Sequence, residues 1–108
     1  MALLECPYLQ SQVELTVERE QHILDRHPEL IPDHIDRIVA TLFAPDEVRR
    51  SQRFSNARLF SRWFESAHQG KHMVVVVVTD DAPTRRDWVI TAYLSRHLSG
   101  GSIEWQRS

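Results

Sequence analysis

The chain is poor in cysteine and glycine and has no long apolar run: its 108 residues include one Cys and three Gly. The single cysteine, Cys6, cannot form an internal disulfide and fits a reducing, cytoplasmic setting. Three glycines leave little room for the phosphate loop of P-loop or Rossmann enzymes. The longest apolar run, residues 73–78, has six residues, whereas a membrane-spanning helix needs about 20. We therefore expect one domain over residues 1–108, with its core between residues 13 and 106, and no membrane association.

Charge is divided unevenly along the chain, although the net charge is only −2. Residues 1–48 hold three arginines and ten carboxylates, a net charge of −7. Residues 49–108 hold nine arginines, one lysine and five carboxylates, a net charge of +5. This division would let one surface bind a polyanion, although charges scattered over a mixed surface would give the same count.

Two short helices are predicted in the first half of the chain. Thr16 is a suitable N-cap for a helix that ends near Arg26, because Pro28 cannot continue it. A second helix is expected between Asp33 and Pro45, where apolar residues recur at i, i+3, i+4 and i+7. The residues of this stripe are Ile35, Ile38, Val39 and Leu42.

Beyond residue 46 the hydrophobic period changes to two, which predicts strands. They are expected at residues 47–52, 58–64, 71–79 and 87–95, with short strands also at 13–17 and 102–106 and a turn at 68–70. The valine run in 71–79 indicates a central strand covered on both faces, whereas the charged segment 47–52 has the character of an edge strand. Helices followed by hairpin-linked strands indicate an α+β fold, with the helices packed on one face of the sheet.

Alternation along the 87–95 strand divides its side chains between the two faces of the sheet. It assigns Trp88, Ile90, Ala92 and Leu94 to the face toward the helices, and Val89, Thr91 and Tyr93 to the other face. The hydroxyls of Thr91 and Tyr93 would form a small polar platform there, although both residue types are also ordinary strand formers.

Two histidines of the first helix are candidate general acids or bases, because imidazole titrates near neutrality. His22 shares a helix face with Arg26, whereas His27 lies about 140° around the helix from His22. Both histidines are equally compatible with surface positions, and His27 in the last turn would also favour the helix dipole. The chain has no His-Glu-x-x-His motif and no cysteine pair, so neither a metal nor a cofactor is predicted.

Cations in the second half are candidates for binding phosphate. Arg49 and Arg58 carry guanidinium groups that can pair with two phosphate oxygens, and Lys71 offers a point charge. Arg58 also alternates with Phe60 along one strand face, a mixture of basic and aromatic groups that suits single-stranded RNA. In the alternative interpretation the aromatic ring lies in the core and the arginine extends to solvent.

Five segments, in this order and spacing, resemble the phage-type branch of the barnase–EndoU–colicin–RelE-like (BECR) nucleases. They are His-Ile-Leu-Asp-Arg-His-Pro-Glu at 22–29, Pro-Asp-Glu-Val-Arg-Arg-Ser at 45–51, Arg-Leu-Phe at 58–60, Lys71 before the valine run, and Thr-Ala-Tyr-Leu at 91–94. The resemblance extends from about residue 13 to residue 105. It implies an α+β fold in which one or two N-terminal helices pack on a four-stranded antiparallel sheet.

The resemblance also implies an activity, because that superfamily contains small ribonucleases, many of them toxins, that need no metal. The implied reaction is attack of an RNA 2′-OH on the adjacent phosphate. The implied site has His22 or His27 as general base or acid, Thr91 and Tyr93 orienting the phosphate, and Arg26, Arg49, Arg58 and Lys71 binding the RNA. The expected partners are RNA and an antitoxin or immunity protein. The alternative is a non-catalytic protein- or nucleic-acid-binding module on the same fold.

Overall fold

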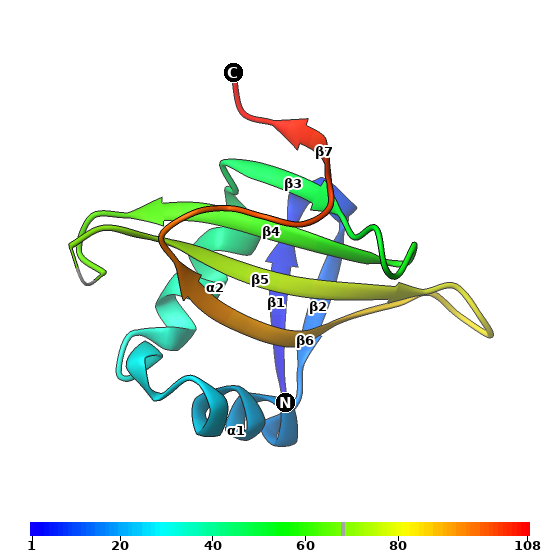
Figure 1. The fold of residues 1–108 in the computed structure, drawn as a ribbon. Helices are drawn as coiled ribbons and strands as arrows, with labels where there is room; N and C mark the ends of the chain where they lie inside the picture. Colours follow the sequence, from blue (N-terminus) through cyan, green and yellow to red (C-terminus); the bar gives the residue numbers. More distant parts are fainter. Residues whose placement is uncertain (68) are drawn as a thin grey trace.

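Within residues 1–67 and 69–108, which the computed structural model describes, seven strands form one sheet in the order β1-β2-β6-β5-β4-β3-β7 (Figure 1). Its strands are β1 (Ala2–Cys6), β2 (Ser11–Leu15), β3 (Glu47–Arg50), β4 (Ala57–Phe64), β5 (Lys71–Asp80), β6 (Arg86–Ser95) and β7 (Ser102–Gln106). The helices are α1 (Val17–Arg26) and α2 (His34–Phe43), with 3₁₀ turns η1 (Pro7–Leu9) and η2 (Pro28–Leu30). Strand pairs are antiparallel except β2 with β6, which are parallel. Part of the turn predicted at 68–70 lies outside the described residues.

The predicted four-stranded antiparallel sheet is wrong, because the described residues form seven strands and one parallel pair. The expected four strands correspond to β3, β4, β5 and β6. The hairpin of β1 and β2 extends the sheet beyond β6, and β7 extends it beyond β3. Strand β1 was not predicted. Leu4 and Cys6 are buried and alternate with exposed residues, but the exposed Leu3, at 54%, is apolar and hides this alternation in the sequence.

The expectation that segment 47–52 is an edge strand is also wrong. Strand β3 pairs with β4 on one side and with β7 on the other. Its two arginines can lie inside a sheet because each meets a carboxylate: Arg49 pairs with Glu47, and Arg50 pairs with Glu104. The sheet instead ends at β1 and β7.

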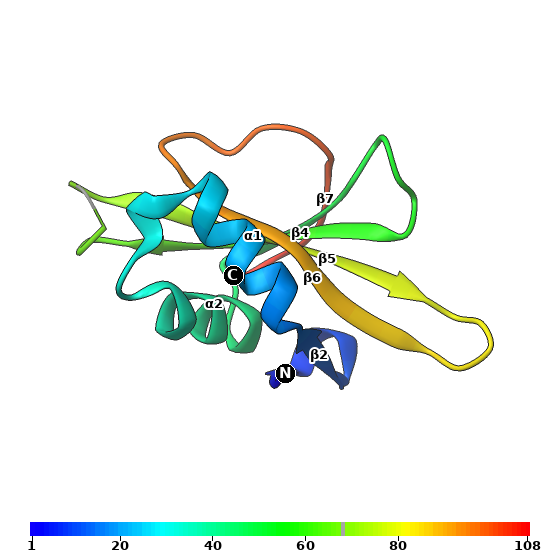
Figure 2. The ribbon, with the colours of Figure 1, turned by 90° about the horizontal axis from the view of Figure 1, so that it is seen from below.

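The predicted helices are confirmed, and their ends follow local chemistry. The Thr16 hydroxyl caps α1 by accepting a hydrogen bond from the Arg19 amide at 3.1 Å. Helix α2 packs against β1, β4 and β5, whereas α1 packs beside β6. Figure 2 shows α2 on one side of the sheet and the segment that leads from β6 to β7 on the other.

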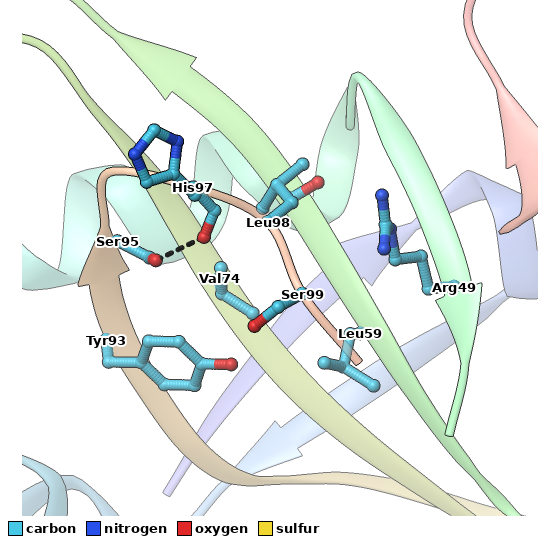
Figure 3. A pocket seen from close by; sticks show the side chains of 9 residues that line it. Arg49, Leu59, Val74, Tyr93, Ser95, His97, Leu98 and Ser99 are labelled. Atoms are coloured by element: carbon cyan, nitrogen blue, oxygen red, sulfur yellow. Dashed lines mark hydrogen bonds between the residues drawn. The ribbon is translucent and has the colours of Figure 1, made fainter. Parts of the chain in front are cut away.

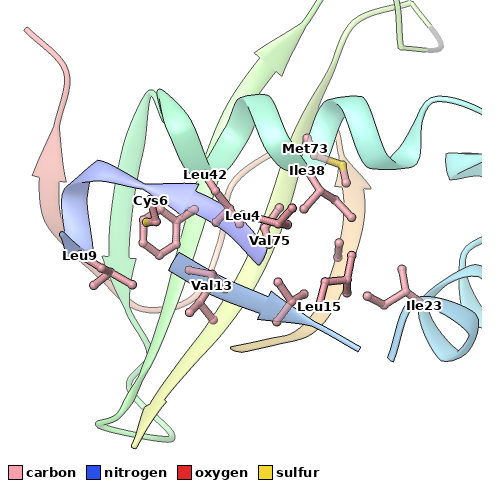
Figure 4. Packing of buried hydrophobic residues seen from close by; sticks show 14 of the residues in the cluster. Leu4, Cys6, Leu9, Val13, Leu15, Ile23, Ile38, Leu42, Met73 and Val75 are labelled. Atoms are coloured by element: carbon pink, nitrogen blue, oxygen red, sulfur yellow. The ribbon is translucent and has the colours of Figure 1, made fainter. Parts of the chain in front are cut away.

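The hydrophobic core lies between α2 and the sheet. Figure 4 shows Ile38 and Leu42 of α2 packing over Met73 and Val75 of β5. The central position of β5 is confirmed, because it is fourth in the strand order. The core side chains of β5, which are Met73, Val75 and Val77, alternate along the strand, so the residues between them face the opposite side of the sheet.

A register shift in β6 alters this alternation. Val76 pairs with Thr91 and Val77 with Val89, which leaves Ile90 as an extra residue. This bulge turns Val89 into the core, where it is fully buried. The prediction that Trp88 faces the helices and Val89 faces away is therefore wrong on the N-terminal side of the bulge.

Candidate functional site

The face of the sheet opposite α2 carries rows of side chains set by the strand register. Across β4, β5 and β6, one row contains Trp63, His72 and Ser95, the next Ser61, Val74 and Tyr93, and the third Leu59, Val76 and Thr91. Strand β3 extends the second row with Glu47 and the third with Arg49. We call this surface the open face. Hydroxyl, imidazole and guanidinium groups therefore share one side of the sheet.

Residues 96–101 cross the open face on their way to β7 and cover a pocket (Figure 3). The pocket is lined by Arg49, Leu59, Ser61, Val74, Tyr93, Ser95, His97, Leu98 and Ser99. The Ser95 hydroxyl donates a hydrogen bond to the backbone oxygen of His97 at 2.5 Å, which fixes the start of the crossing segment. The space left for the centres of water molecules is about 30 Å³, enough for one or two waters.

His27 reaches Tyr93 from the edge of β6. It follows the last residue of α1, where its amide donates to the Ile23 oxygen at 2.8 Å. Its imidazole ring lies 6.0 Å from the Tyr93 ring, centre to centre, with an interplanar angle of 37°. Its Nδ1 lies 3.3 Å from a Glu29 carboxylate oxygen, which orients the ring and leaves Nε2 for another partner. A carboxylate, an imidazole and a phenol therefore follow one another at this edge.

Tyr93 supplies a proton-bearing hydroxyl to the pocket. Burial raises the pKa of its phenol above the usual 10, so the hydroxyl stays protonated at neutral pH. Figure 3 shows this hydroxyl directed toward Leu59 and Ser99. The half-buried side chain of Thr91 shares the open face with Tyr93 but does not line the pocket.

Arg49 lines the pocket and also holds the crossing segment. Its Nε donates to the Glu47 carboxylate at 2.8 Å, and an Nη donates to the Gly100 backbone oxygen at 3.3 Å. Gly101 lies at φ +70°, and a Cβ there would be 2.5 Å from the Arg50 backbone oxygen. Only glycine permits this approach, so the end of the segment is fixed against β3.

The remaining predicted site residues lie elsewhere. His22 and Arg26 are exposed on α1, and within the described residues neither side chain makes a hydrogen bond or ion pair. Arg58 pairs in register with core residue Val77, so it lies on the helix side of the sheet, opposite Tyr93. Lys71 begins β5 on that same side. The structure therefore brings His27, Tyr93 and Arg49 to one region and places Arg58 and Lys71 on the other side of the sheet.

Arg58 belongs to an ion cluster centred on Glu104. The Glu104 carboxylate accepts hydrogen bonds from Tyr8 at 2.6 Å, from Arg50 at 2.7 Å and from Arg58 at 2.9 Å. Burial alone would raise the pKa of Glu104, but these three donors outweigh it and lower the pKa from 4.5 to about 2. Burial and the Glu104 carboxylate raise the pKa of Tyr8 to about 12. The cluster joins β7 to β3, β4 and η1.

Sequence reasoning missed three residues near the pocket: Glu29, His72 and His97. His72 was detectable, because period-two alternation places it on the same face of β5 as Val74 and Val76. His97 follows the end of β6 with no local signal that its segment folds back over the sheet. In Figure 3 its imidazole points away from the Tyr93 hydroxyl.

Two further properties concern metals and membranes. Within residues 1–67 and 69–108, no three His, Cys, Asp or Glu side chains are grouped so that they could hold a metal ion. Over the same part of the chain, no helix is both long and apolar enough to cross a bilayer.

Comparison of the chain with protein-family models, with curated proteins and with solved structures finds no match. The resemblance to phage-type BECR nucleases therefore stays a prediction, carried by the residues of the chain itself.

Proposed function

We propose that this chain is an endoribonuclease that needs no metal, with its site at the edge of the covered pocket on the open face. The observation that carries the proposal is the approach of the His27 ring to within 6.0 Å of the Tyr93 ring. An imidazole able to take a proton therefore lies beside the ring of a tyrosine that, with Arg49, lines the pocket.

In the proposed reaction, His27 Nε2 removes the proton from an RNA 2′-OH, whose oxygen attacks the adjacent phosphorus. The Tyr93 hydroxyl and the Arg49 guanidinium donate hydrogen bonds to the non-bridging oxygens, where negative charge develops. The bond from phosphorus to the 5′ oxygen breaks, and that oxygen takes a proton from His97. The products are a 2′,3′-cyclic phosphate and a 5′-hydroxyl. Glu29 is a positioning residue that holds the His27 ring.

The pocket is too small to admit a phosphate in the conformation described. A space of about 30 Å³ for water centres holds water and no phosphate group. Binding of RNA therefore requires residues 97–99 to move away from Tyr93. Such a movement would break the hydrogen bond between Ser95 and His97, and it would also allow the exposed imidazole of His97 to turn toward the substrate.

The test is cleavage of single-stranded RNA by purified protein in EDTA, with and without ribosomes, and with the ends of the products identified. We expect 2′,3′-cyclic phosphate ends, and we expect His27→Ala to lower the rate at least 100-fold, in the range of general acid–base catalysis. His22→Ala is the matched control: it removes an exposed histidine from the same helix and should leave the rate unchanged. Intact RNA under all these conditions, or equal rates for His27→Ala and the wild type, would reject the proposal.

A non-catalytic binding module is a second proposal, and the free edge of the sheet supports it. Strand β7 is exposed along its whole length, with Ile103 52% and Trp105 38% exposed. An unpaired edge of this kind can accept an extended partner segment. This alternative predicts binding of RNA or a protein partner without cleavage, unchanged in His27→Ala.

A further inference from the structure

We infer that Trp63 is a stacking platform for a nucleobase that neighbours the scissile phosphate, an inference that rests on the proposed function. Trp63 lies near the end of β4 on the open face, in the row with His72 and Ser95. This row is next to the one that contains Tyr93. The indole ring is therefore on the surface that an RNA strand bound at Tyr93 would follow.

The Trp63 ring is held in place on several sides. Its Nε1 donates to a Glu65 carboxylate oxygen at 3.0 Å. The His72 ring meets it edge-on, with centres 4.9 Å apart and an interplanar angle of 71°. Gly70, at φ +86°, lies so close that a Cβ there would be 2.4 Å from Cζ2 of the indole. Any other residue at position 70 would collide with the ring.

Although it is held in this way, Trp63 stays 38% exposed. A large aromatic ring that is both immobilised and open to solvent has little conformational entropy left to lose when a ligand stacks on it. Every nucleobase offers a π face, and stacking on an aromatic side chain contributes about 1–3 kcal/mol per base. These properties favour a nucleobase as the ligand that stacks on the Trp63 ring.

The register sets the distance between the ring and the proposed site of cleavage. Trp63 and Tyr93 are two strands apart and offset by two residues. With strands about 4.8 Å apart and a rise of about 3.3 Å per residue, their Cα atoms are separated by roughly 12 Å. A base on Trp63 therefore belongs to a nucleotide beside the one that is cleaved.

Glu65 adds a preference among bases. One of its carboxylate oxygens accepts the indole N–H, and the other can accept a hydrogen bond from an amino group on the stacked base. Adenine, cytosine and guanine carry such a group and uracil does not. We therefore expect oligo(A) and oligo(C) to bind more tightly than oligo(U).

The experiment measures binding separately from cleavage. The ligands are 2′-O-methyl oligonucleotides of A, C or U, which lack the attacking hydroxyl, and the protein carries Trp88→Phe and Trp105→Phe so that Trp63 alone fluoresces. We expect saturable quenching, weaker with oligo(U). In the wild-type background, Trp63→Ala should weaken binding about 5- to 150-fold, as 1–3 kcal/mol predicts, and Trp63→Phe should retain most of the affinity. Phe43→Ala is the matched control, since Phe43 is also an exposed aromatic residue, at 59%, but it ends α2 on the other side of the sheet.

The outcomes separate this inference from the proposed function. Quenching that depends on Trp63, in a protein that cleaves no RNA, would support the platform and reject the nuclease. Cleavage with the same KM and oligonucleotide affinity in wild type and Trp63→Ala would reject the platform and keep the nuclease. Absence of quenching in the variant with Trp63 as its sole tryptophan would also overturn the platform, whether or not Trp63→Ala folds. Equal quenching by oligo(A) and oligo(U) would reject the role of Glu65.

Discussion

The His27 ring lies 6.0 Å from the Tyr93 ring, although one residue ends a helix and the other lies in a strand. The contact lies where β6 is no longer paired with β2, because these two strands are paired only at Glu14 and Trp88. Beyond that point α1 packs beside β6. Because β2 and β6 separate there, α1 can pack beside β6 and bring His27 close to Tyr93 on the open face.

The first prediction concerns the Tyr93 hydroxyl. Tyr93→Phe keeps the ring that contacts His27 and removes only the donor, so RNA cleavage should fall about 10- to 100-fold while stability changes by less than about 1 kcal/mol. Rates and urea unfolding, measured on the same preparation, check both parts. Because burial raises the pKa of Tyr93, ionisation of this phenol should not lower the wild-type rate below about pH 10. An unchanged rate for Tyr93→Phe would remove Tyr93 from the mechanism.

The second prediction concerns acid stability. The folded pKa of Glu104, about 2, lies below its usual 4.5, so its contribution to stability is present above pH 4.5 and is lost as the pH falls toward 2. Glu104→Gln should cost about 1–2 kcal/mol at pH 7, allowing for screening of a partly exposed group, and the difference should shrink below pH 4.5. Urea unfolding across this range measures it. Glu5→Gln, at an exposed position of β1, is the control, and a difference independent of pH would contradict the assignment.

The third prediction compares two adjacent glycines of the crossing segment. Gly100 and Gly101 both have positive φ, +80° and +70°, but a Cβ on Gly100 meets open space whereas one on Gly101 meets the Arg50 backbone. Gly100→Ala should cost about 1 kcal/mol from backbone strain. Gly101→Ala should cost at least about 1 kcal/mol more, because the backbone of β3 or of the segment must shift. Equal losses in denaturant unfolding would show that the segment does not approach β3 this closely.

The fourth prediction tests the bulge at Ile90. Val89→Thr places a hydroxyl in the core and should destabilise the protein by about 1–3 kcal/mol. Thr91→Val, on the half-buried open face, should change stability by less than about 0.5 kcal/mol. Thermal and urea unfolding of the two variants provide the comparison, because valine and threonine have nearly the same shape and differ in one hydroxyl. If Val89→Thr left the stability of the protein unchanged, Val89 would not lie in the core, and β6 would alternate without a bulge.

Local chemistry made several elements predictable. The Thr16 cap and Pro28 delimit α1, and strict alternation in β4 correctly separates Phe60 and Arg58 from Leu59. The ends of α1 and the alternation in β4 depend only on residues close together in the sequence. Strand β1 was not predicted, because its period is hidden by an exposed leucine. Strand β7 was expected at residues 102–106, but its pairing with β3, more than 50 residues away, has no local signal.

The candidate site was predictable only in part, for the same reason. Alternation places Thr91 and Tyr93 together, since both lie on the C-terminal side of the bulge. The approach of His27 depends on where α1 packs, and the cover over the pocket depends on the path of residues 96–101; neither has a local signal. Strand periodicity placed Arg58 and Phe60 on one strand face but left open which side of the sheet that was; the structure shows that it is the helix side.

The single bridge between β2 and β6 has a consequence for how the site is assembled. The stretch before β3 contributes His27 and Glu29, and the stretch from β3 onward contributes Tyr93 and Arg49. Neither stretch holds both the proposed base and the groups proposed to bind phosphate. The proposed site would therefore be complete only after the N-terminal stretch has packed on the sheet, with α1 beside β6 and α2 against β4 and β5.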